Sequence, residues 1–428
     1  MMQAVDDTTL SLPAVTATLL ERLRVQLAGG RPDWKDSGAP EAHIPVGRYF
    51  SPEVWQAELH GLFRPLPLIA AHSSELAPGQ VLAHDGFDVP LLLSRDADGR
   101  VRCFLNVCRH RGMRLVQAAE GADTRNSVVC PYHGWTYRLD GQLRHMLHAD
   151  SGDSCPKGAR DLVPVPCAER HGLIWVVPDA GGSIDLDGFL EGLDAELPFF
   201  GIDQLRHFRT VEAEYPANWK LIIDAFLESY HIRVLHQDTI YPYFSDGVTS
   251  AACFGPHIHS LVARRAAQEW ATEPGSEPPA TLDAMSRLAT TSQVIFPNTV
   301  TIFHPDYLSL ITVYPTGAET LRWTHRMLIP AAKATPDWTP HWEKTFRLIE
   351  QGVFQKEDIH CAIGIQRGLK TGANRHVTAG RIEQGLAWFH EQVRQRTAPH
   401  LQNAGAAVSA QASTTTTSTP KPESGAPL

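Results

Sequence analysis

The chain of 428 residues is too long for a single hydrophobic core and is expected to fold into two or three domains. Its 43% hydrophobic and 20% charged residues are typical of a soluble globular protein, and its net charge of −9 argues against general binding to nucleic acid. No run of residues is long enough to cross a membrane, no signal-peptide pattern opens the chain, and seven scattered cysteines favour a reducing, cytoplasmic location.

An N-terminal helical arm is predicted over residues 1–45. Four leucines between residues 19 and 27 recur at helical spacing, and the pair Gly29-Gly30 ends that helix. A second helix is predicted to begin at Ser51-Pro52, because proline is favoured at the first helical position.

Two domains are predicted after the arm, an all-β domain over residues 46–178 and a mixed domain over residues 179–400. The first contains short strands joined by turns, as in the hairpin around Asp96 to Gly99. In the second, strands are predicted over residues 207–215, 293–303, 307–315 and 320–329, and helices over residues 218–236, 342–366 and 382–393. The expected fold class is therefore α+β. The tail over residues 401–428 lacks the apolar residues needed to offset the entropy of ordering, so disorder is predicted there.

The predicted helix over residues 218–236 carries charged groups although it has no polar face, which indicates a buried helix. Its ionisable residues are Asp224, Glu228, His231 and His236. On an ideal helix the first three share one face and His236 is out of phase, so a distortion or a helix end is expected near it. Buried acids and imidazoles are costly unless they are paired or bound to metal. A metal site is the economical explanation, and a satisfied core cluster is the alternative.

Two mixed pairs of cysteine and histidine lie about a hundred residues upstream. Cys108 and His110 form a C-x-H pair, and Cys130 and His133 form a C-x2-H pair, with nineteen residues between the two pairs. A Rieske [2Fe–2S] centre has two cysteines and two histidines, with both histidines on one iron. Zinc fingers pair C-x2–4-C with H-x3–5-H, which makes a zinc site the weaker alternative.

The motifs CRHRG and CPYHGW, followed by NWK and E-x2-H-x4-H, resemble those of the large (α) subunits of Rieske non-heme iron oxygenases. The resemblance extends from about residue 45 to about residue 396. It implies a small Rieske [2Fe–2S] domain followed by a helix-grip catalytic domain, and assembly into homotrimers. It also implies an NAD(P)H-dependent flavin or iron–sulfur reductase as electron donor, in some systems acting through a ferredoxin. A small β subunit is left open.

The resemblance further implies one [2Fe–2S] cluster and one mononuclear Fe(II) in each subunit. The implied cluster ligands are Cys108, His110, Cys130 and His133. The implied iron ligands are His231, His236 and Asp358, a 2-His-1-carboxylate facial triad that leaves positions open for O₂. Asp358 is preferred to its neighbour Glu357 because the family's ligand is the second acid of this pair, a little over two helical turns before Gln366. Glu357 is the fallback.

Glu228 is the most informative departure from the family pattern. Most members carry aspartate three residues before the first iron-ligating histidine, and this acid bridges the cluster of one subunit to the iron site of its neighbour. Glutamate at this position resembles the branch of carnitine, choline and betaine monooxygenases. Asp224, one helical turn earlier, is a candidate to hydrogen-bond an iron ligand.

The function implied is the oxygenase component of a Rieske system, which hydroxylates a small organic substrate with O₂ and reductase-supplied electrons. Monooxygenation, including N-demethylation of a quaternary ammonium compound, is the first hypothesis, and cis-dihydroxylation of an aromatic ring is the alternative. A Rieske ferredoxin would need only one small domain, and a zinc-stabilised binding module would have no redox role. Five residues could line a substrate pocket, although such residues more often pack in cores: Phe226, Phe254, Ile295, Phe303 and Tyr307.

Overall fold

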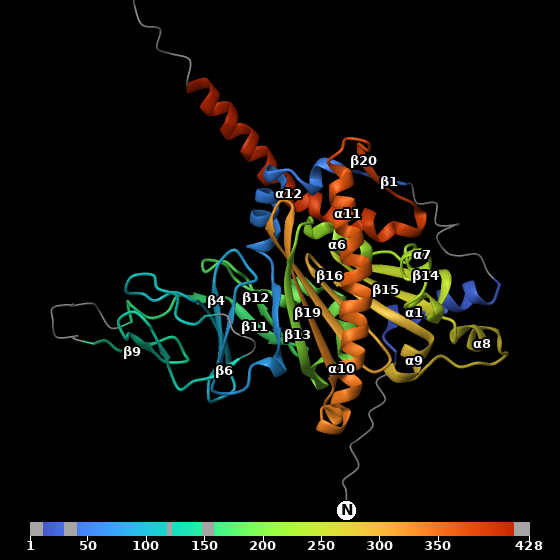
Figure 1. The fold of residues 1–428 in the computed structure, drawn as a ribbon, viewed down its shortest axis with the longest axis horizontal. Coiled ribbons are helices and arrows are strands. Elements are labelled where there is room, and N and C mark those ends of the chain that lie inside the picture. The colour runs from blue at the N-terminus through green and yellow to red at the C-terminus, as the bar shows by residue number, and fades with distance from the viewer. Residues whose placement is uncertain (1–11, 30–40, 118–121, 148–157, 415–428) are drawn as a thin grey trace, which may run out of the picture.

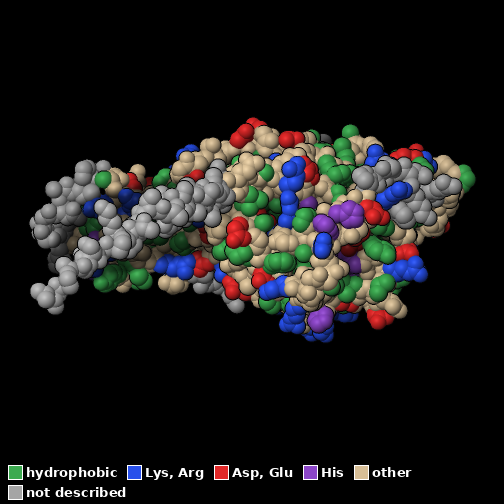
Figure 2. All heavy atoms as spheres, turned by 90° about the horizontal axis from the view of Figure 1, so that it is seen from above, with side chains coloured by type: hydrophobic (Ala, Val, Ile, Leu, Met, Phe, Trp, Pro, Cys, Tyr) green, Lys and Arg blue, Asp and Glu red, His purple; other side chains and the backbone are tan. Residues whose placement is uncertain are grey.

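A computed structural model of the chain describes residues 12–29, 41–117, 122–147 and 158–414. The molecule is elongated, with a small part made of short strands at one end and a larger part built around a long-stranded sheet (Figure 1). Within the described residues, no helix is both long and apolar enough to cross a membrane. On the face drawn in Figure 2, the described acidic and basic side chains are interspersed, without the continuous basic surface that binds nucleic acid.

The described residues of the small part form three antiparallel sheets. A five-stranded sheet has the order β10-β5-β4-β3-β6, and the two three-stranded sheets have the orders β11-β12-β2 and β7-β8-β9. The hairpin predicted around Asp96 to Gly99 is confirmed, because β4 and β5 pair on either side of this turn. The strands are β2 (Leu68–His72), β3 (Gln80–His84), β4 (Leu91–Arg95), β5 (Val101–Leu105), β6 (Asp123–Thr124), β7 (Val128–Val129), β8 (Thr136–Tyr137), β9 (Leu143–His145), β10 (Pro164–Val165), β11 (Cys167–Arg170) and β12 (Leu173–Val176).

The larger part is built on an antiparallel sheet of seven strands in the order β13-β19-β18-β17-β16-β15-β14. The strands are β13 (Leu205–Tyr215), β14 (Phe244–Phe254), β15 (His257–Arg264), β16 (Ala289–Ile295), β17 (Thr299–Phe303), β18 (Leu308–Gly317) and β19 (Thr320–Pro330). The single strand predicted over residues 293–303 is wrong, because residues 296–298 turn the chain between β16 and β17. β14 was not predicted, because small and polar residues such as Ser245 and Gly247 weaken the alternation of apolar and polar residues that is typical of a strand.

Helices cover one face of this sheet. α10 (Thr339–Arg347), a π-helical stretch (Leu348–Ile359) and α11 (His360–Leu369) form one column across the strands, with α6 (Trp219–Phe226) near it (Figure 1). Apolar side chains of the column and of α6 share a buried core with the sheet. The other α-helices within the described residues are α1 (Ala14–Leu27), α3 (Pro52–Glu58), α4 (Leu186–Leu190), α5 (Leu193–Glu196), α7 (Ile232–Leu235), α8 (Ala267–Thr272), α9 (Leu282–Leu288) and α12 (Gln384–Thr414). The mixture of helices with antiparallel sheets confirms the predicted α+β class.

The segment that precedes β2 packs against the larger part. β1 (Ala42–Pro45) pairs with β20 (His376–Ala379), and Tyr49, Leu62 and Phe63 are buried in the same core as α6. This segment also supplies Glu58, whose carboxylate forms a fully buried ion pair with Lys220 of α6 at 2.6 Å. Residues 46–63, which the sequence analysis assigned to the small domain, therefore lie structurally with the larger one.

The helix α12 continues to Thr414, past residue 401, where the sequence analysis placed the start of a disordered tail. Residues 401–414 are rich in alanine, the residue with the highest helix propensity, and this favours continuation of the helix. The last turns of α12 extend away from the body of the molecule (Figure 1). The rest of the predicted tail, residues 415–428, and the start of the predicted arm, residues 1–11, lie outside the described residues.

Candidate metal centres and substrate cavity

The two Cys/His pairs lie on loops that share one backbone turn. In each loop the carbonyl of the cysteine, Cys108 or Cys130, accepts a hydrogen bond at 3.0 Å from the glycine four positions later. The N–H of each cysteine donates to the carbonyl five positions later, at 2.7 Å and 2.8 Å respectively. Gly112 and Gly134 adopt positive φ angles of 78° and 70°, which glycine tolerates best. The same turn therefore presents a cysteine and a histidine twice.

These loops bring the four predicted cluster ligands together in two like pairs. Cys108 and Cys130 are buried free thiols. Burial raises the pKa of Cys108, and Cys130, which lies within hydrogen-bonding range, raises it further. The rings of His110 and His133 have centroids 4.8 Å apart. A sulfur pair beside an imidazole pair suits a cluster that has thiolates on one iron and imidazoles on the other. A single zinc ion would favour four ligand atoms close to one point. Among the described residues, the ligand atoms of these four do not form a group in which all lie within 4.8 Å of one another.

Tyr137 lies against the sulfur of Cys108. Its hydroxyl is 3.4 Å from the Cys108 Sγ and accepts a hydrogen bond from the backbone N–H of Arg109 at 3.0 Å. The Tyr137 hydroxyl is thus oriented to donate to the thiolate form of Cys108. Hydrogen bonds to cluster sulfurs are one of the factors that set reduction potential.

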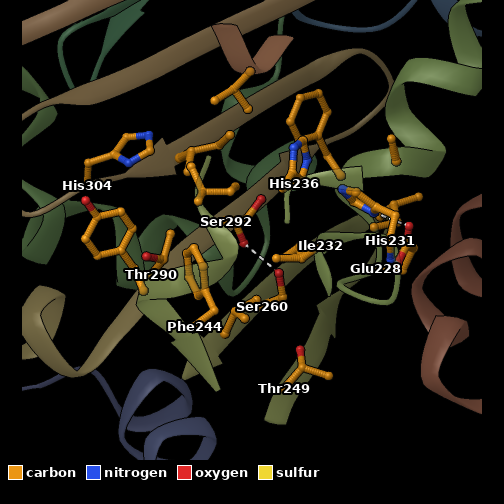
Figure 3. Close-up of a pocket in the computed structure, with 18 of the residues that line it drawn as sticks. Glu228, His231, Ile232, His236, Phe244, Thr249, Ser260, Thr290, Ser292 and His304 are labelled. Atoms are coloured by element: carbon orange, nitrogen blue, oxygen red, sulfur yellow. Dashed lines mark hydrogen bonds and ion pairs between the residues drawn. The ribbon is translucent and has the colours of Figure 1, made fainter. Parts of the chain in front are cut away.

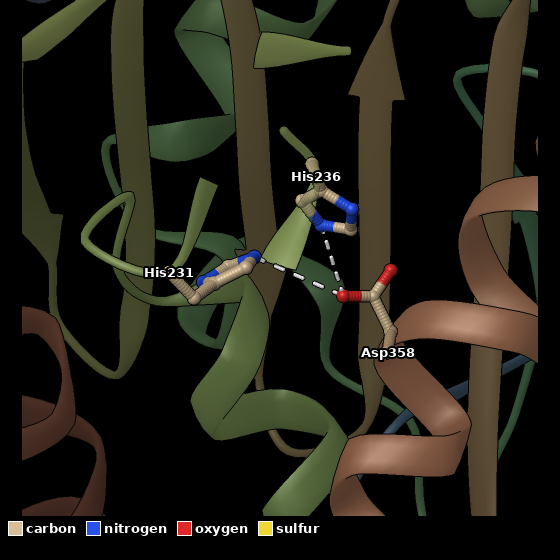
Figure 4. Close-up of side chains that lie close together, drawn as sticks. All are labelled: His231, His236 and Asp358. Atoms are coloured by element: carbon tan, nitrogen blue, oxygen red, sulfur yellow. Dashed lines mark ion pairs between the residues drawn. The ribbon is translucent and has the colours of Figure 1, made fainter. Parts of the chain in front are cut away.

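At the other end of the molecule, His231, His236 and Asp358 present ligand atoms that all lie within 4.8 Å of one another (Figure 4). The Asp358 Oδ1 is 3.1 Å from the Nε2 of His236 and 3.8 Å from the Nε2 of His231. His236 and Asp358 are buried, whereas His231 is partly exposed. The structure thus assembles the three predicted iron ligands.

The segment that carries the two histidines is not the single helix predicted over residues 218–236. Asn218 caps the start of α6 with its side chain, and the helix ends at Phe226. Glu228 lies in the loop that follows, and His231 and His236 stand immediately before and after the single turn α7. The predicted shared helical face of Asp224, Glu228 and His231 is therefore wrong, whereas the expected helix end near His236 is present.

Asp358 is held by the helical column on the far side of the site. It lies near the end of the π-helical stretch, in which the wider turns change the direction of successive side chains. The column is fixed to the start of α6 by Gln366, whose Oε1 accepts a hydrogen bond from the Asn218 N–H at 2.8 Å. This contact joins the helix of the carboxylate to the segment of the two histidines.

Each iron-site histidine is oriented by a carboxylate on its other ring nitrogen. The Nδ1 of His231 hydrogen-bonds Glu228, and the Nδ1 of His236 hydrogen-bonds Glu357 at 2.6 Å. These contacts leave both Nε2 atoms to face Asp358. The role of Glu357 was missed in the sequence, where it was the fallback ligand. No local signal in the sequence identifies this role, because it depends on where the helical column meets the segment that carries His236.

Asp224 does not contact either histidine of this site. Its carboxylate accepts a hydrogen bond from the Tyr49 hydroxyl at 2.8 Å and lies 2.9 Å from the Nε2 of His390 on α12. Asp224 therefore connects α6 to the N-terminal segment and to α12. The prediction that Asp224 hydrogen-bonds an iron ligand is therefore wrong.

The electrostatics of the site fit a bound cation. Asp358 is buried, and among the described residues its only ion-pair partners are the two histidines. Burial lowers the pKa of His236, but Asp358 and Glu357 outweigh it and raise this pKa above the usual range. The site thus attracts positive charge. Two imidazoles and one carboxylate, with free space beside them, are the donor set of non-heme Fe(II) sites.

A cavity of about 850 Å³ opens beside the three ligands (Figure 3). This volume is within the range of small-molecule sites. Of the five residues considered as pocket lining, Phe226 and Tyr307 line this cavity. Ile295 and Phe303 lie in the core next to the small part, and Phe254 is partly buried against that core. The hydroxyl residues Ser260, Thr290 and Ser292 lie between His304 at one end of the view and His231 and His236 at the other (Figure 3).

Two protein-family models match the chain. The model of the Rieske [2Fe-2S] domain matches residues 67–162, and the model of the ring hydroxylating alpha subunit (catalytic domain) matches residues 202–398. The first range contains both Cys/His loops, and the second contains the two histidines and Asp358.

Relatives with assigned functions match most of the chain. The carnitine monooxygenase oxygenase subunit of Acinetobacter baumannii is 29% identical over 366 residues, which cover 81% of this chain and 92% of the relative. The chloroplastic choline monooxygenase of Spinacia oleracea is 26% identical over 365 residues, which cover 82% and 77%. A solved structure of a quaternary ammonium Rieske monooxygenase aligns with a TM-score of 0.72 and 24% identity, covering 85% of this chain and 97% of that one.

Proposed function

This chain belongs to the α subunits of Rieske non-heme iron oxygenases, and from this premise we propose that it hydroxylates a quaternary ammonium compound with O₂. Enzymes of this family carry a [2Fe–2S] cluster and a mononuclear iron, and a separate reductase supplies their electrons. We propose an NAD(P)H-dependent flavin or iron–sulfur reductase as the donor. When bound, the mononuclear iron supplies the open coordination positions at which O₂ is activated.

We propose that Cys108, His110, Cys130 and His133 hold the cluster and that His231, His236 and Asp358 hold the iron. Glu228 and Glu357 accept the Nδ1 protons of the two iron-site histidines, which fixes the tautomer whose Nε2 is free to bind metal. Buried Asp358 contributes the negative charge that retains a divalent cation. Apolar side chains such as Ile232 and Phe354 border the cavity beside these ligands and limit the access of water.

Electron transfer between subunits is part of the proposal. Within one chain, the strands that follow the cluster loops lie at the opposite end of the molecule from α7 (Figure 1). Electron transfer to an iron at α7 is therefore better served by a neighbouring subunit. Glu228 contacts His231, keeps about 10% of its side chain exposed and lies beside the exposed Tyr230, where a neighbour can reach it. We propose a homotrimer in which Glu228 joins His231 to a cluster histidine, most simply His133, of the next subunit.

The observation that carries the substrate class is the aromatic lining beside the iron ligands. Phe226 ends the helix that precedes Glu228, and Phe354 lies four residues before Asp358. Their rings meet edge to face at 6.0 Å, and Trp388 borders the same cavity. Aromatic faces attract quaternary ammonium groups through cation–π interactions. The carnitine and choline monooxygenases among the relatives act on such compounds, which supports this substrate class over aromatic-ring dihydroxylation.

A single-turnover experiment tests the proposal. Holoenzyme with reduced cluster is mixed with O₂ and L-carnitine, glycine betaine, choline or naphthalene, and cluster oxidation is followed by its visible absorbance. We expect at least one quaternary ammonium compound to accelerate cluster oxidation and to yield an oxygenated or demethylated product by mass spectrometry. Naphthalene should do neither. Oxidation of naphthalene, with none of the three ammonium compounds consumed, would overturn the proposal.

A further inference from the structure

A positively charged group lies inside the substrate cavity, away from the iron ligands. Arg264, the last residue of β15, is half-buried and lines the cavity. Its Nη1 donates a hydrogen bond to the Thr290 hydroxyl at 3.1 Å. Its guanidinium carbon lies 5.8 Å from the ring centroid of Tyr243 and 5.6 Å from that of Phe244. The aromatic rings and the Thr290 hydroxyl thus hold the guanidinium group in place.

No carboxylate neutralises Arg264 among the described residues, since neither an ion pair nor a second hydrogen bond involves its guanidinium group. The acids that line the cavity are already engaged. Glu228 and Asp358 serve the iron site, and Asp306 hydrogen-bonds His341 at 3.0 Å. Burial lowers the pKa of Arg264, which indicates that the charged form lacks compensation from solvent. A half-buried cation without an anionic partner is costly, and a ligand can supply the opposite charge.

Unpaired polar atoms accompany Arg264 along the same cavity. The hydroxyls of Ser250 and Ser292 and the Nε2 of His304 are buried without a hydrogen-bond partner, and all three residues line the cavity. Burial, reinforced by the charge of Arg264, lowers the pKa of His304 to about 3, so its ring is neutral and its Nε2 can carry a proton. Buried polar groups in native proteins are nearly always paired. Several unpaired polar groups along one cavity therefore indicate that a polar ligand forms hydrogen bonds with them.

These polar groups lie away from the iron ligands. His304 is drawn at the opposite end of the cavity from His231 and His236, with Thr290 on the same side as His304 (Figure 3). A ligand that spans the cavity therefore meets the iron site with Phe226 and Phe354 at one end. At the other end it meets Arg264, which Thr290 and two aromatic rings hold in place. A purely cationic ligand gains nothing from the second end, because the guanidinium group repels it.

We propose, resting on the proposed function above, that Arg264 binds the carboxylate of a zwitterionic substrate, a quaternary ammonium acid, with help from Thr290 and His304. The ammonium group then lies at the aromatic end beside the iron ligands, and the carboxylate lies at the guanidinium end. Arginine suits this role because its planar fork matches the two oxygens of a carboxylate. A quaternary ammonium alcohol, which lacks the anionic end, fits this cavity less well.

The inference is tested by comparing Arg264→Gln with wild type on three probes: L-carnitine, γ-butyrobetaine and choline. The Kd of each probe for the oxidised holoenzyme is measured by calorimetry, and KM and kcat are measured with the reductase. Loss of a charge-assisted hydrogen-bond pair is expected to raise Kd and KM for the two carboxylated probes about 10- to 100-fold. The Kd of choline should change little or fall, because a repulsive charge is removed. Arg287→Gln removes an exposed arginine paired with Asp283 on α9, and as a matched control it should leave all three probes unchanged.

Arg264→Lys is the second variant, in case Arg264→Gln does not fold. Lysine keeps the charge but loses the fork, so its Kd for the carboxylated probes should lie between those of wild type and Arg264→Gln. The inference is overturned if choline binds wild type as tightly as L-carnitine does, or if Arg264→Gln weakens all three probes equally. In that case oxidation of any of the probes still supports the proposed function. Conversely, carboxylates that carry no ammonium group could bind tightly and depend on Arg264. That result would support the carboxylate-binding role of Arg264 and contradict the proposed quaternary ammonium substrate.

Discussion

The two metal-binding regions of this protein are built in different ways. In the small part, two loops with the same turn each supply one cysteine and one histidine, and the turn is closed by the loop's own backbone hydrogen bonds. In the larger part, two ligands flank the single turn α7 and the third comes from a helix about 120 residues later. Each iron-site histidine also depends on a carboxylate of its own, Glu228 or Glu357.

This difference predicts how the two regions respond to substitution. A site made of local turns keeps its geometry as long as the loop itself folds. A site assembled from distant segments depends on each long-range contact, such as the one between Gln366 and the start of α6. We therefore expect substitutions at the iron site to weaken or abolish iron binding or electron transfer, and substitutions around the cluster to change its reduction potential.

The largest effect is expected from Asp358→Ala. This change removes the carboxylate that lies between the two imidazoles, so the mononuclear iron and all turnover should be lost. The visible spectrum of the cluster should stay as in wild type, because its loops do not depend on the helical column. Iron and acid-labile sulfide analysis measures both outcomes on one sample. Full retention of iron in Asp358→Ala would show that the ligand is misassigned.

Glu228→Gln is expected to slow oxidation of the reduced cluster by more than 100-fold while both metals remain bound. The amide oxygen can still accept the Nδ1 proton of His231, but the negative charge that links two subunits is lost. Stopped-flow absorbance after mixing with substrate and O₂ measures the rate. Glu228→Asp, which keeps the negative charge, should retain part of the wild-type rate of cluster oxidation. A wild-type rate in Glu228→Gln, or full activity in a strict monomer, would contradict the proposed bridge.

Glu357→Ala is expected to weaken iron binding about 10- to 100-fold, the usual cost of losing a residue that orients a metal-ligating histidine. Glu357 also accepts a hydrogen bond from the Thr239 hydroxyl at 2.8 Å, so its removal frees two groups at once. Competition with an Fe(II) chelator measures the affinity. Glu357→Gln, which keeps an acceptor, should lose less. Equal affinities in wild type and Glu357→Ala would mean that packing alone orients His236.

The same contrast explains how much of the molecule could be predicted from the sequence. The cluster loops could be predicted from the sequence because each carries its two ligands and its glycine within a few residues. The iron histidines were found by motif, but the helix expected to hold them ends at Phe226, because tertiary packing overrode helical periodicity. The role of Glu357 was missed because it depends on how two distant segments meet. Arg264 went unnoticed, since nothing in the sequence shows which side chains of β15 face a cavity.

The smallest expected effect is a change in the potential of the cluster in Tyr137→Phe. The Tyr137 hydroxyl is 3.4 Å from the Cys108 sulfur and is fixed by the Arg109 N–H. A hydrogen bond to sulfur stabilises the reduced cluster more than the oxidised one, because the reduced form carries more negative charge. Losing a bond worth about 1 kcal/mol lowers a one-electron potential by roughly 40 mV. Redox titration monitored by the visible absorbance of the cluster measures this shift.

The control for this change lies on the neighbouring loop. Tyr132 has 56% of its surface exposed, and its ring centroid lies 3.7 Å from that of His133 at an interplanar angle of 33°. The Tyr132 hydroxyl contacts Arg111 rather than a sulfur. Tyr132→Phe therefore removes a hydroxyl near the cluster without removing a hydrogen bond to it, and the potential should not change. A shift of equal size in both variants would mean that general polarity sets the potential. Loss of the cluster in Tyr137→Phe would instead show that the loops are less independent of their surroundings than their shared turn suggests, because one hydroxyl outside both loops would then be holding them.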